Sequence, residues 1–307
     1  MSLPSEWLKS MGFQNRYFLL RHGQSEANVN SLVSSLYCVS VEQHGLTPLG
    51  ITQSRESAIE LYNLSSKDAP SVDILNSPAR IQTTTVLNAN LNNVIFYSSD
   101  FKRAYETAHY CKEQLKLHVQ GISSDSTPKL IDGDSDPSQD SSLVDGEASE
   151  HESTVYGTDG TSQSPILSED KSQHQQPTDA SLTQLPSPYP ALYTSPLLRE
   201  RYFGVFEASV PSDEAYRQVW QEDSKKDVES DHYGVESIQS VVSRTTHLIL
   251  ELEQIWRDKI IVLVSHGDVC QIIQSVFSCI DPRHHRSIPH MNNAELREVF
   301  LVETREV

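Results

Sequence analysis

Two histidines of this chain follow short apolar runs, and a glycine follows each histidine. His22 comes after the run Tyr17–Leu20, with Arg21 directly before it. His266 comes after the run Ile260–Val264. Short apolar runs bounded by polar residues predict buried strands, and the ligand site of an open α/β sheet lies where such strands end. An arginine offers a bidentate fork to an anion, and a neutral imidazole is a nucleophile. These residues therefore predict a site for a phosphoryl group.

A second arginine is expected at the same edge of the sheet. The run Val94–Tyr97 predicts a third strand, and the next residues predict a helix from Phe101 to Leu117, with Arg103 in its first turn. The free amides and the dipole of a helix N-terminus favour an anion. If the three strands share one sheet, two arginines and two histidines meet at their carboxyl ends. Such a pocket suits a dianion, because phosphoryl transfer depends on positioning and on stabilising the charge of the equatorial oxygens.

The same chemistry needs a proton donor on the leaving-group side, and Glu200 is the leading candidate. The aromatic residues Tyr202 and Phe203 follow closely and would desolvate the carboxyl group, which raises its pKa. The alternative role for Glu200 is a surface salt bridge with Arg199 or Arg201. The sequence does not decide between these two roles.

The composition of the 307 residues argues against some classes of partner. The formal net charge is -18, which is unfavourable for binding nucleic acid or an anionic membrane. Residues 1–15 show no signal-peptide pattern, and no run approaches the ~18 apolar residues of a membrane span. The four cysteines form no metal-like Cys-x-x-Cys pair, which favours reduced thiols. We therefore expect a cytoplasmic protein.

One segment, at about 121–188, differs in composition from the rest of the chain. It is rich in Ser, Asp, Gln and Pro, and the stretch from Gly121 to Pro190 holds thirteen acidic residues against two lysines. Such a segment cannot bury enough apolar surface to offset the entropy cost of ordering it. We expect one domain over residues 1–307, interrupted by a disordered acidic insertion. The alternative for this insertion is a regulated segment with phosphorylatable Ser-Pro sites.

The remaining elements alternate between helix and strand. A helix is predicted from Pro48, after an N-cap at Thr47, and another after Gly234–Ser237. An apolar helix is predicted over Val269–Phe277, and the last strand over Leu296–Val302. This alternation predicts an α/β fold in which much of the sheet is parallel.

The ordered set of these motifs resembles the histidine phosphatase superfamily, in the branch that contains cofactor-dependent phosphoglycerate mutase and fructose-2,6-bisphosphatase. The motifs occur in the family's order, at Arg21 to Asn28, Leu46 to Gln53, Ser98 to Ala108, Leu198 to Gly204, Gly234 to Ser237, Ser265 to Gly267 and Asn293 to Glu295. The first and last motifs are weak alone, but the ordered set is highly specific. The resemblance implies a phosphoglycerate mutase-like three-layer α/β/α sandwich with a mostly parallel central sheet.

The resemblance also implies a role for each matched residue. His22 would become phosphohistidine. The residues that would bind the phosphoryl group are Arg21, Asn28, Arg103, His266 and Gly267. Glu200 would protonate the leaving oxygen and then activate water. No metal and no organic cofactor is implied.

Three departures separate the chain from the family pattern. Gln24 replaces the usual glutamate, which we expect to be tolerated. The loop of residues 29–45 is longer than in the mutases and lacks their Gly-Trp-x-Asp sequence. The acidic insertion is expected near the rim of the site, where it would hinder anionic substrates or act as a lid. Specificity is expected to lie in residues 29–45 and 208–234, which show no readable pattern.

Three functions from different classes follow from this pattern. The first is a histidine acid-type phosphatase, which hydrolyses phosphomonoesters of a small molecule or a phosphoprotein through a phosphohistidine. The second is a phosphoglycerate mutase-type phosphotransferase. It is disfavoured because the chain ends at Val307, a few residues after the last predicted strand, without the C-terminal tail that closes the family mutases. The third is an inactive member that acts as a binding module, and it is disfavoured because all five chemical positions are present. The physiological substrate and the oligomeric state stay open.

Overall fold

The computed structural model describes residues 12–65, 91–121, 190–209, 213–225 and 232–302. The described residues belong to one compact unit, built from the parts of the chain on either side of the predicted acidic insertion. That insertion, at about 121–188, lies outside the described residues apart from Gly121. Its disorder and the single domain over residues 1–307 therefore stay predictions.

A sheet of five strands forms the centre of the described part of the chain. The strands are β1 Arg16–Arg21, β2 Val94–Ser98, β3 Ala191–Thr194, β4 Ile260–Ser265 and β5 Leu296–Val299. Their order across the sheet is β3-β2-β4-β1-β5, and only β5 is antiparallel, beside β1. This confirms the predicted α/β fold with a mostly parallel sheet, although the last strand ends at Val299 rather than Val302. The sequence does not predict β3, because this edge strand is partly exposed and has no continuous apolar run.

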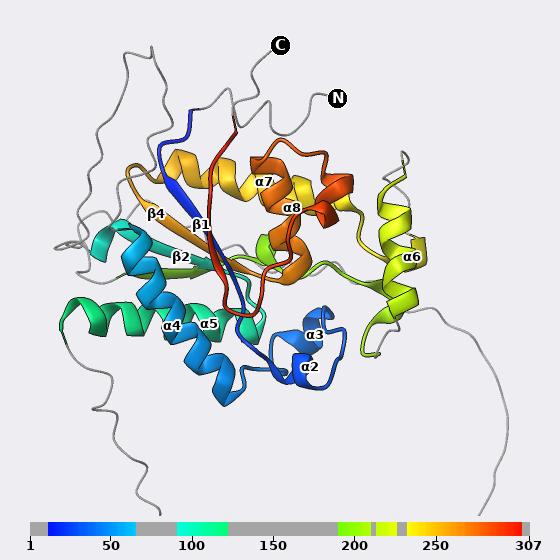
Figure 1. Cartoon of the computed structure of the whole chain (residues 1–307), viewed down its shortest axis with the longest axis horizontal. Helices are drawn as coiled ribbons and strands as arrows, with labels where there is room; N and C mark the ends of the chain where they lie inside the picture. The colour runs from blue at the N-terminus through cyan, green and yellow to red at the C-terminus, as the bar shows by residue number, and fades with distance from the viewer. Residues whose placement is uncertain (1–11, 66–90, 122–189, 210–212, 226–231, 303–307) are drawn as a thin grey trace, which may run out of the picture. The chain divides into compact units, whose positions relative to one another are not determined.

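Helices cover both faces of the sheet, which confirms the three-layer α/β/α sandwich (Figure 1). On one face lie α4 (Pro48–Ser65) and α5 (Lys102–Val119), and on the other α7 (Ile238–Ile255) and α8 (Gly267–Phe277). Thr47 caps α4 as predicted, since its hydroxyl accepts a backbone N–H of the first turn at 3.1 Å. Among the residues described above, no helix combines the length and apolar character that crossing a membrane requires.

The other helices are short and lie in the connections between these elements. They are α2 Glu26–Val29, α3 Tyr37–Ser40, α6 Asp213–Asp223, and the 3₁₀ turns η2 Leu91–Asn93, η5 Pro196–Leu198, η6 Gly204–Phe206, η7 His232–Gly234 and η8 Pro282–Ser287. The segments 29–45 and 208–234, which have no readable sequence pattern, thus contain α3 and α6. The four residues of α3 are too few to show a period. Helix α6 is mostly polar, so it lacks the high apolar content that marks α7 and α8.

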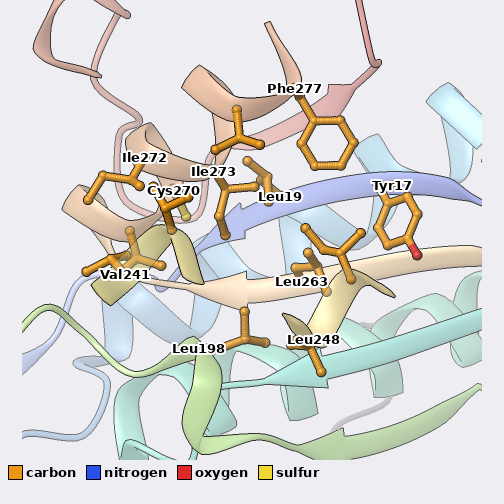
Figure 2. Packing of buried hydrophobic residues seen from close by; sticks show 14 of the residues in the cluster. Tyr17, Leu19, Leu198, Val241, Leu248, Leu263, Cys270, Ile272, Ile273 and Phe277 are labelled. Atoms are coloured by element: carbon orange, nitrogen blue, oxygen red, sulfur yellow. The ribbon is translucent and has the colours of Figure 1, made fainter. Parts of the chain in front are cut away.

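Alternate side chains of the central strands enter two separate cores. Tyr17 and Leu19 of β1 pack with Leu263 of β4 and with α7 and α8 (Figure 2). Phe18 and Leu20 face the opposite way and pack with α4 and α5. A strand that is covered on both faces needs a continuous apolar run, and all six residues of β4 are buried. All four cysteines are free thiols, as expected, and two of them lie in these cores.

The central position of β4 generates a stability prediction. Leu263→Ala removes a fully buried side chain, so we expect the free energy of unfolding to fall by about 2–5 kcal/mol. Leu49→Ala makes the same chemical change at an exposed position of α4 and should cost less than about 0.5 kcal/mol. Urea denaturation followed by circular dichroism measures both values. Equal losses in the two variants would contradict the central packing of β4.

Candidate active site

The register between β1 and β4 places the two predicted histidines side by side. The strands are parallel, and Arg21 of β1 pairs with Ser265 of β4. His22 and His266 therefore leave the sheet at the same level, and their ring centroids lie 5.2 Å apart. The N–H of His22 donates to the Ser265 carbonyl at 2.9 Å, which fixes the first residue beyond β1. The structure thus brings both histidines to one point at the carboxyl edge of the sheet.

Two hydrogen bonds determine which nitrogen of His22 carries the proton. Nδ1 lies 2.8 Å from the carbonyl oxygen of Gly23, which can only accept. Nε2 lies 3.3 Å from Nε of Arg103, and a guanidinium can only donate. The proton is therefore assigned to Nδ1, and Nε2 presents a lone pair. A neutral imidazole with an unprotonated Nε2 is the nucleophilic form, and here Arg103 donates to that nitrogen.

The turn after His22 depends on the close approach of two glycines. A Cβ at Gly23 would lie 2.6 Å from the carbonyl oxygen of Gly50, and a Cβ at Gly50 would lie 2.1 Å from that of Gln24. Neither position has room for a side chain, so both need glycine. The side chain of Gln24 accepts the Thr47 hydroxyl at 2.8 Å through its amide oxygen. An amide oxygen can accept this bond as a carboxylate does, which agrees with the expected tolerance of Gln24.

Arg103 reaches the histidines from the first turn of α5. Its side chain is buried, and its Nη2 donates to the carbonyl oxygen of Ser34 at 2.7 Å. The loop of residues 29–45 therefore lies directly against the predicted phosphoryl site. Glu207 holds this loop in place, because its carboxylate accepts the backbone N–H groups of Ser35 at 2.9 Å and Leu36 at 3.0 Å. Sequence reasoning missed Glu207, since no local pattern marks an acid that accepts backbone amides of a distant loop.

Three buried nitrogens around the histidines have no hydrogen-bond partner within the described residues. They are Arg21 Nε, Arg103 Nη1 and His266 Nδ1. His266 Nδ1 can act as a donor, because the Ser99 hydroxyl lies 3.0 Å from Nε2, already accepts the Phe101 N–H and has its own proton to give. A buried donor without an acceptor costs free energy. Each of these donors lacks an acceptor among the described residues, and the oxygens of an anion are acceptors of the kind they require.

Burial and the two arginines set the charge of the site. Burial, followed by Arg103 and Arg21, holds the pKa of His22 well below its ordinary value. Burial and Arg103 lower the pKa of His266 in the same way. Burial also lowers the pKa of Arg103 to about 10, so this guanidinium remains charged at neutral pH. The site then holds two neutral imidazoles and two cations, an environment that favours a dianion.

Glu200 lies partly buried after η5, and its Oε1 accepts the backbone N–H of Arg201 at 3.0 Å. The neighbouring arginines pair with other acids. Arg199 Nη2 lies 2.5 Å from an Asp100 carboxylate oxygen, and the side chain of Arg201 pairs with Asp223. The salt bridge that was the alternative role for Glu200 is thus absent from the described contacts.

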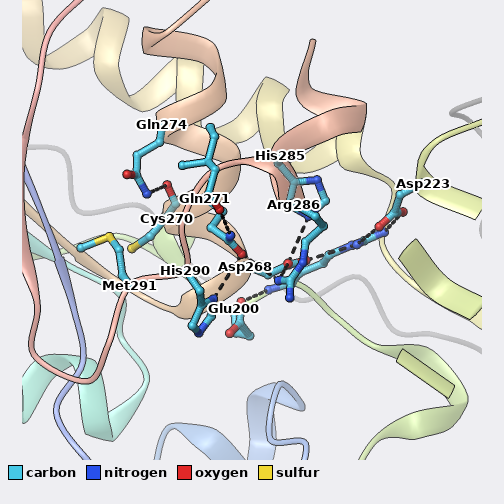
Figure 3. Close-up of polar contacts among 12 residues, drawn as sticks. Glu200, Asp223, Asp268, Cys270, Gln271, Gln274, His285, Arg286, His290 and Met291 are labelled. Atoms are coloured by element: carbon cyan, nitrogen blue, oxygen red, sulfur yellow. Dashed lines mark hydrogen bonds and ion pairs between the residues drawn. The ribbon is translucent and has the colours of Figure 1, made fainter. Parts of the chain in front are cut away.

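A buried ionic network joins Arg201, the residue after Glu200, to Asp223 and Asp268. Figure 3 shows Asp223, Asp268 and His285 of this network near Glu200. Arg201 binds the Asp223 carboxylate with both terminal nitrogens, at 2.7 and 2.6 Å. Its Nη1 also donates to Asp268 at 3.2 Å, and the other oxygen of Asp268 lies 3.2 Å from Nε2 of His285. Burial alone would raise the pKa of Asp268, but His285 and Arg201 outweigh it and hold this pKa far below its ordinary range. Asp268 therefore stays negatively charged.

The charge of Asp268 acts on Glu200. Burial first and Asp268 second raise the pKa of Glu200 to about 7, against the opposing influence of Arg103 and Arg21. At neutral pH both protonation states of Glu200 are therefore populated. A carboxyl group in this condition can give a proton in one step and take one in the next. Asp268 directly follows the Ser-His-Gly motif, but the motif itself gives no sign of this influence.

Two further predicted residues border the same site. Three donors converge on the side-chain oxygen of Asn28: the Ser25 N–H and the Ser25 hydroxyl, both at 3.0 Å, and the Asn293 amide at 3.2 Å. The Asn28 amide nitrogen is then the group left to donate to a ligand. Gly267 is the first residue of α8, and a Cβ there would lie 3.4 Å from Arg21 Nε. The N-terminus of α8, whose first amides lack intrahelical acceptors, therefore lies beside Arg21.

The network makes a prediction for the titration of Glu200. Asp268→Asn removes the nearby negative charge, so the pKa of Glu200 should fall from about 7 toward its ordinary value of 4.5. Carbon NMR of the labelled carboxyl group across pH measures this value. Asp223→Asn, which alters the same network without being a major influence on Glu200, is the control, and melting temperatures verify the fold of both variants. An unchanged pKa in a folded Asp268→Asn variant would contradict the coupling.

Comparisons with known proteins bear on the fold and the family of this chain. Residues 178–305 match the model of the family described as histidine phosphatase superfamily (branch 1). A solved structure titled mycobacterial hydrolase 1 is 19% identical, with a TM-score of 0.50, and the match covers 92% of this chain and 87% of that chain. A mycobacterial glucosyl-3-phosphoglycerate phosphatase complexed with VO3 is 18% identical, with a TM-score of 0.50, over 92% of this chain and 89% of that chain. No curated protein sequence matches significantly.

Structures of this low identity show the fold alone. Together with the family match over residues 178–305, they support the resemblance to the histidine phosphatase superfamily predicted from the ordered motifs.

Proposed function

We propose that this chain hydrolyses phosphomonoesters through a phosphohistidine formed on His22. One observation carries the proposal: Arg21, Arg103 and His266 each have a buried nitrogen without a partner among the described residues, and His22 beside Arg103 and His266 is a neutral imidazole with an unprotonated Nε2. A phosphoryl group would fit both features, since its oxygens would accept from these nitrogens while its phosphorus met Nε2. The oxygen-rich, doubly charged transition state would gain most from such preorganised donors.

The first half of the reaction transfers the phosphoryl group to the enzyme. Nε2 of His22 attacks phosphorus, and the bond between phosphorus and the leaving oxygen breaks. Arg21, Arg103 and His266 stabilise the charge on the equatorial oxygens. Protonated Glu200 gives its proton to the leaving oxygen, so that an alcohol departs and the carboxylate remains.

The second half returns the enzyme to its starting state. The Glu200 carboxylate takes a proton from water while the water oxygen attacks the phosphohistidine. The bond between phosphorus and Nε2 breaks, inorganic phosphate leaves, and His22 is again neutral. The pKa of Glu200 at about 7 supports both roles, because neither protonation state is inaccessible at neutral pH.

A phosphorylated small molecule is the substrate class that we propose. The mycobacterial relative of known structure is named for a phosphorylated sugar acid. Because that structure is only 18% identical to this chain, glucosyl-3-phosphoglycerate is included in the assay panel and is not predicted to be the substrate. Phosphate release should be assayed on sugar phosphates, nucleotides, phosphorylated acids and a phosphopeptide. Phosphoryl transfer to a second substrate in place of water would instead indicate a mutase.

His22→Ala tests the covalent step. We expect loss of phosphate release from p-nitrophenyl phosphate and loss of the phosphoenzyme seen by mass spectrometry after rapid quenching. The melting temperature should stay close to that of the wild type, because His22 follows the last residue of β1. His247→Ala, which changes an exposed histidine of α7, is the matched control and should keep full activity. Near-normal turnover by His22→Ala would rule out this mechanism.

Glu200→Gln tests the general acid through the leaving group. An alkyl phosphate leaves as a basic alkoxide and needs a proton in the transition state, whereas p-nitrophenolate hardly needs one. Phosphoenzyme formation from the alkyl ester should therefore slow by roughly 10²–10⁴-fold, and formation from the aryl ester far less. Single-turnover rates on both esters measure the difference. Equal slowing on both would remove Glu200 from this role.

A further inference from the structure

A third histidine, outside every motif described above, lies against Arg21. Nε2 of His290 is 3.0 Å from Nη1 of Arg21, and the carbonyl oxygen of Met291 accepts from the same nitrogen at 2.7 Å. The ring also touches the start of α8, since a Cβ at Gly267 would lie 2.9 Å from Cε1 of His290. The segment after η8 thus packs a histidine ring between Arg21 and the helix N-terminus.

The surrounding hydrogen bonds determine the tautomer of His290. Arg21 can only donate, so Nε2 of His290 must be the acceptor. Nδ1 then carries the proton and points to the side-chain oxygen of Gln271, 3.2 Å away. The Gln271 amide is fixed in this orientation, because its oxygen accepts from Arg286 at 2.7 Å and its nitrogen donates to the Ile288 carbonyl at 2.7 Å. Figure 3 shows Gln271 beside His290 and Arg286.

These contacts hold only one end of the Arg21 side chain. Nη1 is bound by His290 and Met291, while Nε is buried without a partner in the described part of the chain. An arginine fixed at one nitrogen loses little further freedom when its other donors bind an anion, which favours binding.

We propose that His290 is a positioning residue that fixes the Arg21 guanidinium for the phosphoryl group. The inference rests on the proposed function, which assigns Arg21 to that group. His290 acts through Arg21 and takes no part in the chemical steps.

The charges around His290 keep it in the neutral form that this role requires. They come from each neighbouring element: Arg21 of β1, Arg286 of η8, Arg297 of β5 and Asp268 of α8. Burial and these three cations hold the pKa of His290 at about 4, and Asp268 opposes them only in part. Above this pKa the ring accepts from Arg21. Below it the ring gains a proton, loses its acceptor and repels the guanidinium.

Three variants test the proposal, with inorganic phosphate as the probe. His290→Ala should weaken phosphate binding, measured by isothermal titration calorimetry at pH 7, by roughly tenfold, as expected for the loss of one positioning hydrogen bond. His290→Gln places an amide oxygen near the position of Nε2 and should bind phosphate within about threefold of wild type. His284→Ala, at an exposed histidine on the same segment, should leave binding unchanged.

Two further measurements separate positioning from a general structural effect. In an Arg21→Ala background, His290→Ala should cause no additional loss of phosphate affinity, because the residue through which it acts is gone. As the pH falls from 6 to 4, kcat/KM of the wild type should fall more than kcat/KM of His290→Gln. The reason is that His290 gains a proton toward pH 4, whereas glutamine does not titrate there.

The outcomes distinguish this inference from the proposed function. Wild-type affinity in His290→Ala, or additive losses in the double variant, would overturn the inference while hydrolysis by the wild type still supported the proposed function. Phosphate binding that depends on His290 in a protein without hydrolysis would support the inference and contradict the proposed function. No phosphate binding by the wild type would overturn both.

Discussion

The parallel register of β1 and β4 is the constraint on which the site depends. Arg21 pairs with Ser265, so the next residue of each strand, His22 and His266, leaves the sheet at the same level. A slip of one residue would exchange the buried faces of a strand and separate the two rings. Both strands are buried on both faces, between two hydrophobic cores that share no residue. The packing that stabilises the fold therefore also fixes the spacing of the histidines.

Burial gives these groups their chemistry. An exposed histidine is partly protonated near neutral pH, but burial and two adjacent guanidinium groups lower the pKa of His22 and keep its Nε2 unprotonated, where it accepts from Arg103. The same burial leaves donors of Arg21, Arg103 and His266 unpaired within the described residues. The packing of the surrounding cores offsets the free-energy cost of these unpaired donors. Because an anion would remove that cost, the site favours an anion.

A buried network of charges influences the protonation of Glu200. The Arg201, Asp223, Asp268 and His285 network keeps a negative charge next to Glu200 and so raises its pKa, while Arg21 and Arg103 lower it. Burial of the carboxyl group raises this pKa most and Asp268 adds to the rise, so that the pKa lies near 7 despite the opposing arginines. The acid of the proposed reaction is thus set by residues of α6, α8 and η8, which never need to touch the substrate.

The sequence by itself determined the features that depend on neighbouring residues. Continuous apolar runs marked β1, β2 and β4, and caps and periodicity marked α4, α5 and α7. The ordered motifs also predicted a site at His22, Arg103, Glu200 and His266. Tertiary structure alone decided the rest. The strand β3 is short and partly exposed, and the helix α6 is mostly polar, so neither has the apolar content that marks the central elements. The bond between His290 and Arg21 joins residues 269 positions apart. Such contacts, like those of Asp268 and Glu207, arise from how distant segments pack, and no local pattern of residues encodes them.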